Sequence, residues 1–254
     1  MRAYDVLMKE FQIAGVLCIV QLTACGSPPP PPSVRSPADG PRSLIAAVKA
    51  NDVSAIEAAL RTGVDPDLRQ DLQSQVGGVS SEQSFEVPLV IAVREAHEKA
   101  AEALLEAGAD PNLRAGGFGW GETPLLTAVR LGNTQLVSVL LRYGADHSLR
   151  IGPFQAKERI TGRANALTYA VNYNRVESVE LLLIAGASPH TEHLARAIAG
   201  AQTDIAYLLL AAGVNPRLVS TRGRTAIQEA ALLPAEKRQE VIALIEQFLR
   251  HPFY

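Results

Sequence analysis

The sequence is poor in cysteine and in aromatic residues. Its 254 residues include only two cysteines, Cys18 and Cys25, so the chain beyond position 25 has none. A disulfide framework is therefore excluded for most of the protein, and the fold must depend on packing. Aromatic residues make up 5% of the chain, whereas alanine and leucine are abundant. Small side chains let helices approach closely, so this composition favours stacked helices over a β-sandwich.

A strong positive charge and the usual catalytic motifs are also missing. The net charge is −2, which argues against a nucleic-acid partner because such domains carry a basic excess. No nucleophile elbow, phosphate loop or zinc-ligand pattern is present. His190 and His193 are three residues apart across an expected turn, and a coincidental pair explains them better than a metal site does. We therefore predict no catalytic residue, no cofactor and no metal.

The N-terminus has the pattern of an export signal. Residues 11–24 form an apolar run that is too short to cross a bilayer but has the length of a secretory signal core. The run ends in Leu22-Thr23-Ala24-Cys25, which resembles the lipobox of bacterial lipoproteins. The alternatives are an uncleaved anchor and a chance match. Asp5 is unusual in a positively charged signal start, so translation from Met8 is an alternative to translation from Met1.

The lipobox resemblance implies a lipid on Cys25 and a signal peptide over residues 1–24. Gly26 follows Cys25, where an aspartate would usually retain such a protein in the inner membrane. The resemblance therefore implies an outer-membrane anchor that faces the periplasm. Residues 25–41 are rich in proline, with five consecutive prolines at 28–32. Because proline fixes φ and lacks an N–H group, we expect a stiff tether of about 3.1 Å per residue.

A helical unit recurs in the rest of the chain. In its clearest copy, Thr123 can cap a helix, Pro124 suits the first helical position, and Gly132-Asn133 separates two apolar helical stripes. Gly144 suits the left-handed conformation that ends a helix. Glycines at comparable places close the other copies; they are Gly63, Gly108, Gly186 and Gly213.

This unit resembles the ankyrin repeat, whose signature is T-P-L-H-x-A in a period of about 33 residues. Leu126 stands where the motif has histidine. The resemblance implies an all-α ankyrin-repeat solenoid over residues 42–254, with about six helix-turn-helix units, and a role in binding other proteins. The glycine spacing is irregular, so the extra residues must lie in hairpin fingers at about 69–85, 114–121 and 150–163.

The resemblance also places the candidate binding residues. Ankyrin repeats bind partners through finger tips and through positions near the end of each first helix. These positions hold Lys49, Arg94 and Arg130, which we expect to form a basic column on the concave face, and Asn172 and Ala199 further along. The remaining candidates are Tyr173 beside Asn172 and Phe118 and Trp120 in the third finger. Trp120 is either an interface anchor or a ring folded onto the helices beneath it.

These features lead to a functional hypothesis. We expect a non-catalytic lipoprotein of the bacterial envelope that binds a protein partner, with an acidic patch on that partner facing the basic column. One specific form is an immunity or inhibitor protein against a toxin that acts in the periplasm. The alternatives are a structural adaptor or a stress-protection partner of an envelope enzyme, and a hydrolase is less favoured because no nucleophile and base can be paired.

Overall fold

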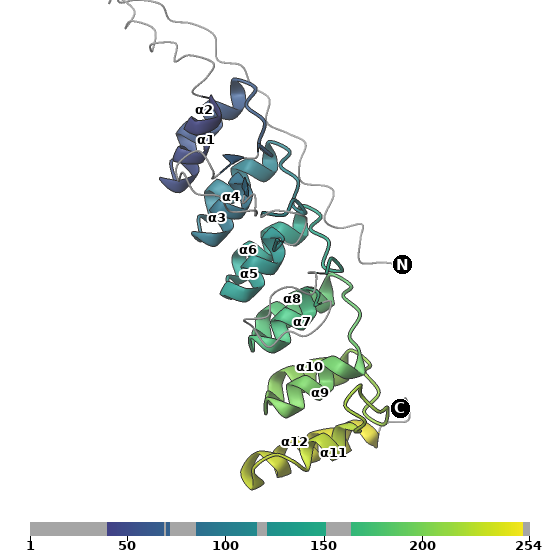
Figure 1. Cartoon of the computed structure of the whole chain (residues 1–254). Helices are drawn as coiled ribbons and strands as arrows, with labels where there is room; N and C mark the ends of the chain where they lie inside the picture. The colour runs from purple at the N-terminus through teal and green to yellow at the C-terminus, as the bar shows by residue number, and fades with distance from the viewer. Residues whose placement is uncertain (1–39, 69, 72–84, 116–120, 151–163, 251–254) are drawn as a thin grey trace, which may run out of the picture. The chain divides into compact units, whose positions relative to one another are not determined.

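The computed structural model describes residues 40–68, 70–71, 85–115, 121–150 and 164–250. Twelve helices lie in these ranges (Figure 1). The helices are α1 Gly40–Lys49, α2 Val53–Arg61, α3 Pro88–Arg94, α4 Glu98–Glu106, α5 Pro124–Leu131, α6 Thr134–Arg142, α7 Ala166–Asn172, α8 Val176–Ile184, α9 Thr191–Ala199, α10 Thr203–Ala211, α11 Ala226–Ala230 and α12 Ala235–Leu249.

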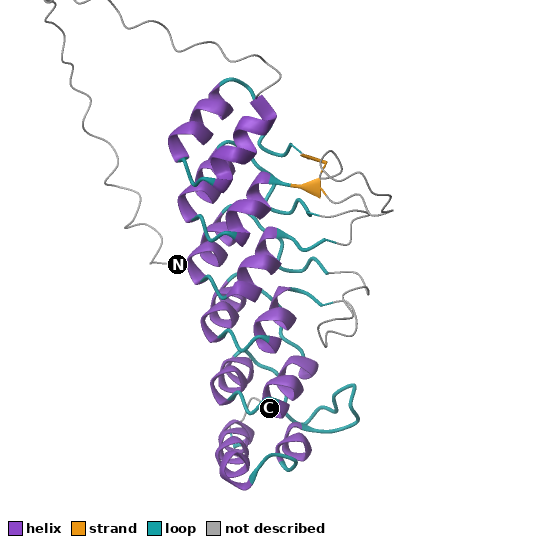
Figure 2. Ribbon diagram, turned by 60° about the vertical axis from the view of Figure 1, so that its left-hand side comes forward, coloured by secondary structure: helices purple, strands orange, loops and turns teal. Residues whose placement is uncertain are grey.

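The helices form six consecutive pairs, which we number as units one to six from α1/α2 to α11/α12. In each unit the two helices contact each other. The first helix of every unit also contacts the first helix of the next unit, and the second helices do the same. Figure 2 shows the result as two rows of helices with connecting loops on one side. The predicted all-α solenoid of six units is confirmed.

Local sequence explains the bounds of unit three. The Thr123 hydroxyl accepts a hydrogen bond from the Leu126 amide at 3.3 Å, which caps α5. The side chain of Asn133 caps α6 in the same way, accepting from Leu136 N at 3.0 Å. Gly132 lies between the two helices with φ +76°. The predicted caps and the predicted break at Gly132-Asn133 are confirmed.

The tight turn inside units one, two, four and five uses residues other than glycine. Asn51, Ala96, Asn174 and Ala201 occupy the place that Gly132 has in unit three, and each has φ between +53° and +57°. Asparagine tolerates this left-handed conformation, but alanine does so at a cost of roughly 1–2 kcal/mol. The stacking of neighbouring units therefore overrides the local preference at Ala96 and Ala201.

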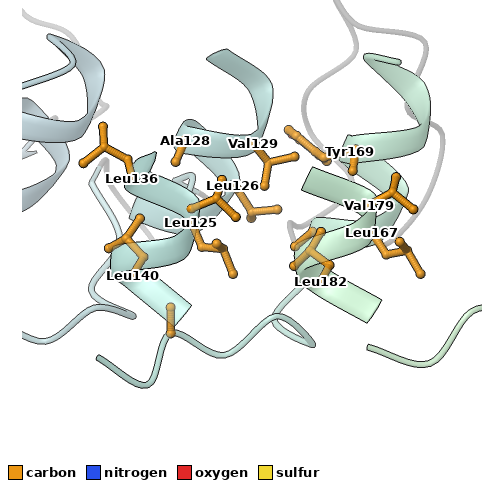
Figure 3. Packing of buried hydrophobic residues seen from close by; sticks show 14 of the residues in the cluster. Leu125, Leu126, Ala128, Val129, Leu136, Leu140, Leu167, Tyr169, Val179 and Leu182 are labelled. Atoms are coloured by element: carbon orange, nitrogen blue, oxygen red, sulfur yellow. The ribbon is translucent and has the colours of Figure 1, made fainter. Parts of the chain in front are cut away.

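A continuous apolar core runs through the stack. Leu125, Leu136 and Leu140 are buried in unit three, and Leu167 and Leu182 are buried beside them in unit four. Figure 3 shows these side chains packed between the two units. Because each unit buries its apolar face against its neighbours, this core is extended along the stack rather than gathered at one centre.

The long insertions lie in the loops between units. Two short strands, β1 Gln70–Asp71 and β2 Phe85–Glu86, pair antiparallel between α2 and α3 in the sequence. Most of the predicted extra residues at 69–85, 114–121 and 150–163 lie outside the described residues; a helix ends before each of these ranges and another begins after it. Within the described ranges, no helix combines the length and the apolar character that a membrane crossing requires.

Candidate protein-binding surface

Lys49, Arg94 and Arg130 occupy one equivalent position in units one to three, two residues before the left-handed turn. The structure brings the first two together on Glu86, the last residue of β2. Lys49 Nζ lies 2.8 Å from one carboxylate oxygen of Glu86, and Arg94 Nη2 lies 3.7 Å from the other. Arg94 also lies 3.6 Å from Glu95. A single carboxylate thus links units one and two.

Arg130 forms a bidentate ion pair with Glu122. Its Nε and Nη2 donate to the Glu122 carboxylate at 3.1–3.2 Å, and Thr127 Oγ1 donates to the same carboxylate at 3.1 Å. The side chain of Glu122 is only 13% exposed. Planar guanidinium and carboxylate groups match in this geometry, so the pair is well oriented.

The expected basic column therefore has carboxylates built into it. In units two and three the glutamate lies eight residues before its arginine, at 86 and 94 and at 122 and 130. Lys49 and Arg94 remain about half exposed, whereas Arg130 is 29% exposed. The three cations are in contact with Glu86, Glu95 and Glu122, so this part of the surface is close to neutral.

Units four and five continue the column with uncharged residues. Asn172 and Ala199 occupy the equivalent positions, and Arg196 Nη1 donates to Asn172 Oδ1 at 3.4 Å. Tyr173 is half-buried at the C-terminal end of α7 and packs against the core. Its ring lies 5.7 Å from that of buried Tyr169. Tyr173 thus borders the surface and also supports the stack.

The remaining candidate residues cannot be placed. Phe118 and Trp120, the predicted contacts of the third finger, and Cys25, the predicted lipidation site, lie outside the described residues. Their roles stay predictions.

Side chains at the turn of one unit hold the preceding unit. His97 Nδ1 lies 2.9 Å from the Val48 carbonyl oxygen, Gln202 Nε2 donates to the Val171 carbonyl at 2.9 Å, and Arg175 Nη2 donates to the Arg130 carbonyl at 3.0 Å. Each accepting carbonyl lies in the last turn of a first helix; those of Val48 and Val171 also accept from the Asn51 and Asn174 amides of their own turns, at 3.1 and 3.2 Å. These bonds fix the spacing of the candidate surface.

His193 joins units four and five. It is 5% exposed; its Nδ1 accepts from the His190 amide at 3.0 Å, and its Nε2 lies 3.1 Å from Thr168 Oγ1. Burial, helped by the charges of His190 and Arg196, lowers the pKa of His193 to about 4. No group of three potential metal ligands occurs among the described residues. Through its contact with Thr168, His193 joins α9 to α7.

The loop between α10 and α11 contains residues that sequence reasoning missed. Glu229 is 2% exposed on α11, and it pairs with Arg222 at 2.7 Å and with Arg224 at 3.1 Å. Burial opposes ionisation of Glu229, but hydrogen bonds and charge from the two arginines hold its pKa below the ordinary value. The spacing of the terminal glycines gives no measure of this loop, because unit six has no terminal glycine after Gly213.

The comparisons with known proteins agree with this architecture. Residues 89–193 match a family model described as ankyrin repeats, in three copies. An ankyrin repeat domain from Acinetobacter baumannii is 25% identical, with 81% of this chain and 96% of that chain covered and a TM-score of 0.63. Bcl-3, described as a member of the IκB protein family, is 20% identical over 82% of this chain and 85% of its own ankyrin repeat domain, with a TM-score of 0.58. A search of curated protein sequences found no match.

Proposed function

We propose that this ankyrin-repeat solenoid is a non-catalytic module that binds one protein partner while tethered to a bacterial membrane by a lipid on Cys25. The ankyrin-repeat fold carries the proposal, because ankyrin repeats are modules of protein–protein interaction. The described units add a rigid surface whose side chains are fixed by bonds between units. Such preorganisation lowers the entropy lost when a partner binds.

The location follows from the lipobox-like sequence before Cys25. We propose an anchor in the outer membrane with the solenoid in the periplasm, because Gly26 replaces the usual retention residue. Mass spectrometry of membrane-extracted protein tests this, since it should find an acylated cysteine at the mature N-terminus. A Cys25→Ser protein that is still cleaved after residue 24 and still bound to membranes would contradict the proposal.

The most specific form of the proposal is an immunity or inhibitor protein that neutralises a toxin acting in the periplasm. A tethered binding module that occupies a toxin would suit that task. Pull-down with the full chain from envelope extract, followed by titration of the recovered partner, tests the binding function. A partner that is a toxin supports the immunity role, whereas an envelope enzyme supports the adaptor role. If no protein is recovered at any salt concentration, the binding function itself is wrong.

A further inference from the structure

The loop between α10 and α11 projects beyond the helices as a separate feature of the solenoid (Figure 2). We call residues 215–225 the last finger. Its backbone closes on itself, because Ser220 N donates to Arg224 O and Gly223 N donates to Ser220 O, both at 2.9 Å. At its base, Arg217 N donates to Asn215 Oδ1 at 2.9 Å. The last finger is therefore a fixed turn.

Glu229 anchors the last finger on the helix that follows it. Both oxygens of this buried carboxylate are used, one by Arg222 and one by Arg224. A guanidinium carries five N–H donors, and each arginine commits one of them to Glu229. The two arginine side chains remain 40% and 46% exposed. The finger thus presents oriented donors to solvent.

The charge balance around the last finger differs from that of the column in units one to three. Two arginines share one carboxylate, Glu229. Thr221 Oγ1 hydrogen-bonds to Glu192, whose carboxylate already pairs with Arg196 at 3.2 Å. Within this set of ion pairs, three arginines, Arg196, Arg222 and Arg224, share two carboxylates, and both carboxylates are engaged. The remaining positive charge suits a partner that supplies carboxylates.

Apolar side chains accompany this charge. Leu218 and Val219, which precede the turn of the last finger, are 54% and 60% exposed, and Leu232 after α11 is 65% exposed. Ile227 on α11 adds a fourth large apolar side chain at 39% exposure. Leu218 and Val219 belong to the same finger as the two oriented arginines, and exposed apolar side chains together with arginine are typical of interaction surfaces.

From this arrangement we infer that the last finger is a docking surface for an acidic protein segment that carries an apolar side chain. The carboxylates of the segment bind the outward N–H groups of Arg222 and Arg224, and its apolar side chain packs on Leu218 and Val219. This inference rests on the proposed protein-binding function and assigns it a site. A protein segment fits better than a lipid surface, because the paired arginines are held in one orientation, which suits paired carboxylates.

The test uses the full chain and three fluorescent peptides of equal length. The first peptide has four glutamates flanking Leu-Phe, the second has lysines in place of the glutamates, and the third keeps the glutamates but has Ser-Ser in place of Leu-Phe. Fluorescence anisotropy should show saturable binding of the first peptide and at least tenfold weaker binding of the other two. Binding of the chain to anionic phosphatidylglycerol vesicles is measured in parallel and tests the alternative that the finger binds a lipid surface.

Matched variants locate the binding. The double variant Leu218→Ser/Val219→Ser should weaken binding of the first peptide at least tenfold, as should Arg222→Gln/Arg224→Gln. Ile184→Ser is the control for apolar exposure, since Ile184 is 76% exposed on α8. Arg61→Gln/Arg142→Gln is the control for charge, since both arginines are exposed at the ends of second helices, outside the candidate surface. Both controls should change binding less than twofold. Thermal melts identify any variant that fails to fold. If the Arg222/Arg224 variant does not fold, the Leu218/Val219 variant alone tests the site.

Several outcomes would overturn the inference. They are equal loss of binding in either control variant, no saturable binding of the first peptide, and finger-dependent binding to vesicles alone. The function and the site can fail separately. A partner recovered by pull-down that binds the Leu218/Val219 variant as tightly as the parent chain leaves the binding function in place and removes this site.

Discussion

On the first-helix surface of units one to three, each cation contacts a nearby carboxylate. Lys49 and Arg94 contact Glu86, and Arg130 contacts Glu122. The last finger of unit six instead has two arginines on one buried glutamate, beside exposed Leu218 and Val219. In both places the surface is built on a pair of helices that contact each other. The difference shows that charge on a repeat surface must be judged from its pairing, since a sequence count of cations overstates how much of that charge a partner can use.

The largest expected effect tests whether unit three, which lies in the first region, and unit five, which directly precedes the last finger, differ only at their surfaces. Leu140 in unit three and Leu209 in unit five occupy equivalent buried positions, and both are fully buried. Leu140→Ala and Leu209→Ala should each lower the free energy of unfolding by about 2–5 kcal/mol, because each leaves a cavity between units. Urea titration measures both. If one of the two substitutions lowers the free energy of unfolding by less than about 1 kcal/mol, the cores of units three and five are not equally packed.

A second prediction concerns the contact between units four and five at His193 and compares stability at two pH values. Its folded pKa of about 4 lies below the ordinary value of about 6.5, so the unfolded chain binds more protons between these values. This contribution to stability is complete above pH 6.5 and is lost as the pH falls toward 4, by on the order of 3 kcal/mol.

Urea titrations of the parent chain and of His193→Gln at pH 7 and pH 4.5 measure this pH dependence. The difference between the two pH values should shrink in the variant. An equal pH effect in both proteins would assign the acid sensitivity to other groups.

A third comparison sets the two anchoring glutamates against each other. Glu229→Gln should destabilise the protein by about 1–3 kcal/mol, because a buried carboxylate that bridges two cations is lost. Glu122→Gln should cost less, because Glu122 binds a single arginine and is more exposed. Thermal melts of both variants give the order. A larger loss for Glu122→Gln would mean that the column in units one to three is the better organised surface.

The smallest effect concerns the tight turns. Ala96→Gly in unit two and Ala201→Gly in unit five should each stabilise the protein by about 0.5–1 kcal/mol, since glycine adopts positive φ without the steric penalty of alanine. Gly144→Ala, which introduces that penalty at φ +84° with open space around the new Cβ, should have the opposite sign. Stabilisation by only one of the two substitutions would show that the turns are not equivalent.

Much of the fold could be predicted because its signals are local. The Thr123 cap, the break at Gly132 and the left-handed Gly144 depend on residues within one helical turn, and the structure confirms each of them. The turns at Ala96 and Ala201 carry no such signal, because alanine has no preference for positive φ. There the contacts between units decide the backbone.

The candidate site was harder to predict because it depends on contacts across units. The sequence placed Lys49, Arg94 and Arg130 at equivalent positions, and the structure agrees. It could not show that Lys49 of unit one reaches Glu86 of unit two, since that contact spans 37 residues. Glu229 was missed for a related reason: its partners lie in a loop that no repeat signature describes. Only the geometry distinguishes a buried anchor from a solvated glutamate.

The bonds from His97, Arg175 and Gln202 to carbonyls of the preceding unit give the chain a direction. In units one, three and four the first helix receives a hydrogen bond at its end from a residue that is synthesised after it. Such a unit, when it has just left the ribosome, therefore lacks this bond until the turn of its successor arrives. Folding that advances with the chain, one unit behind the point of emergence, follows from that order of arrival.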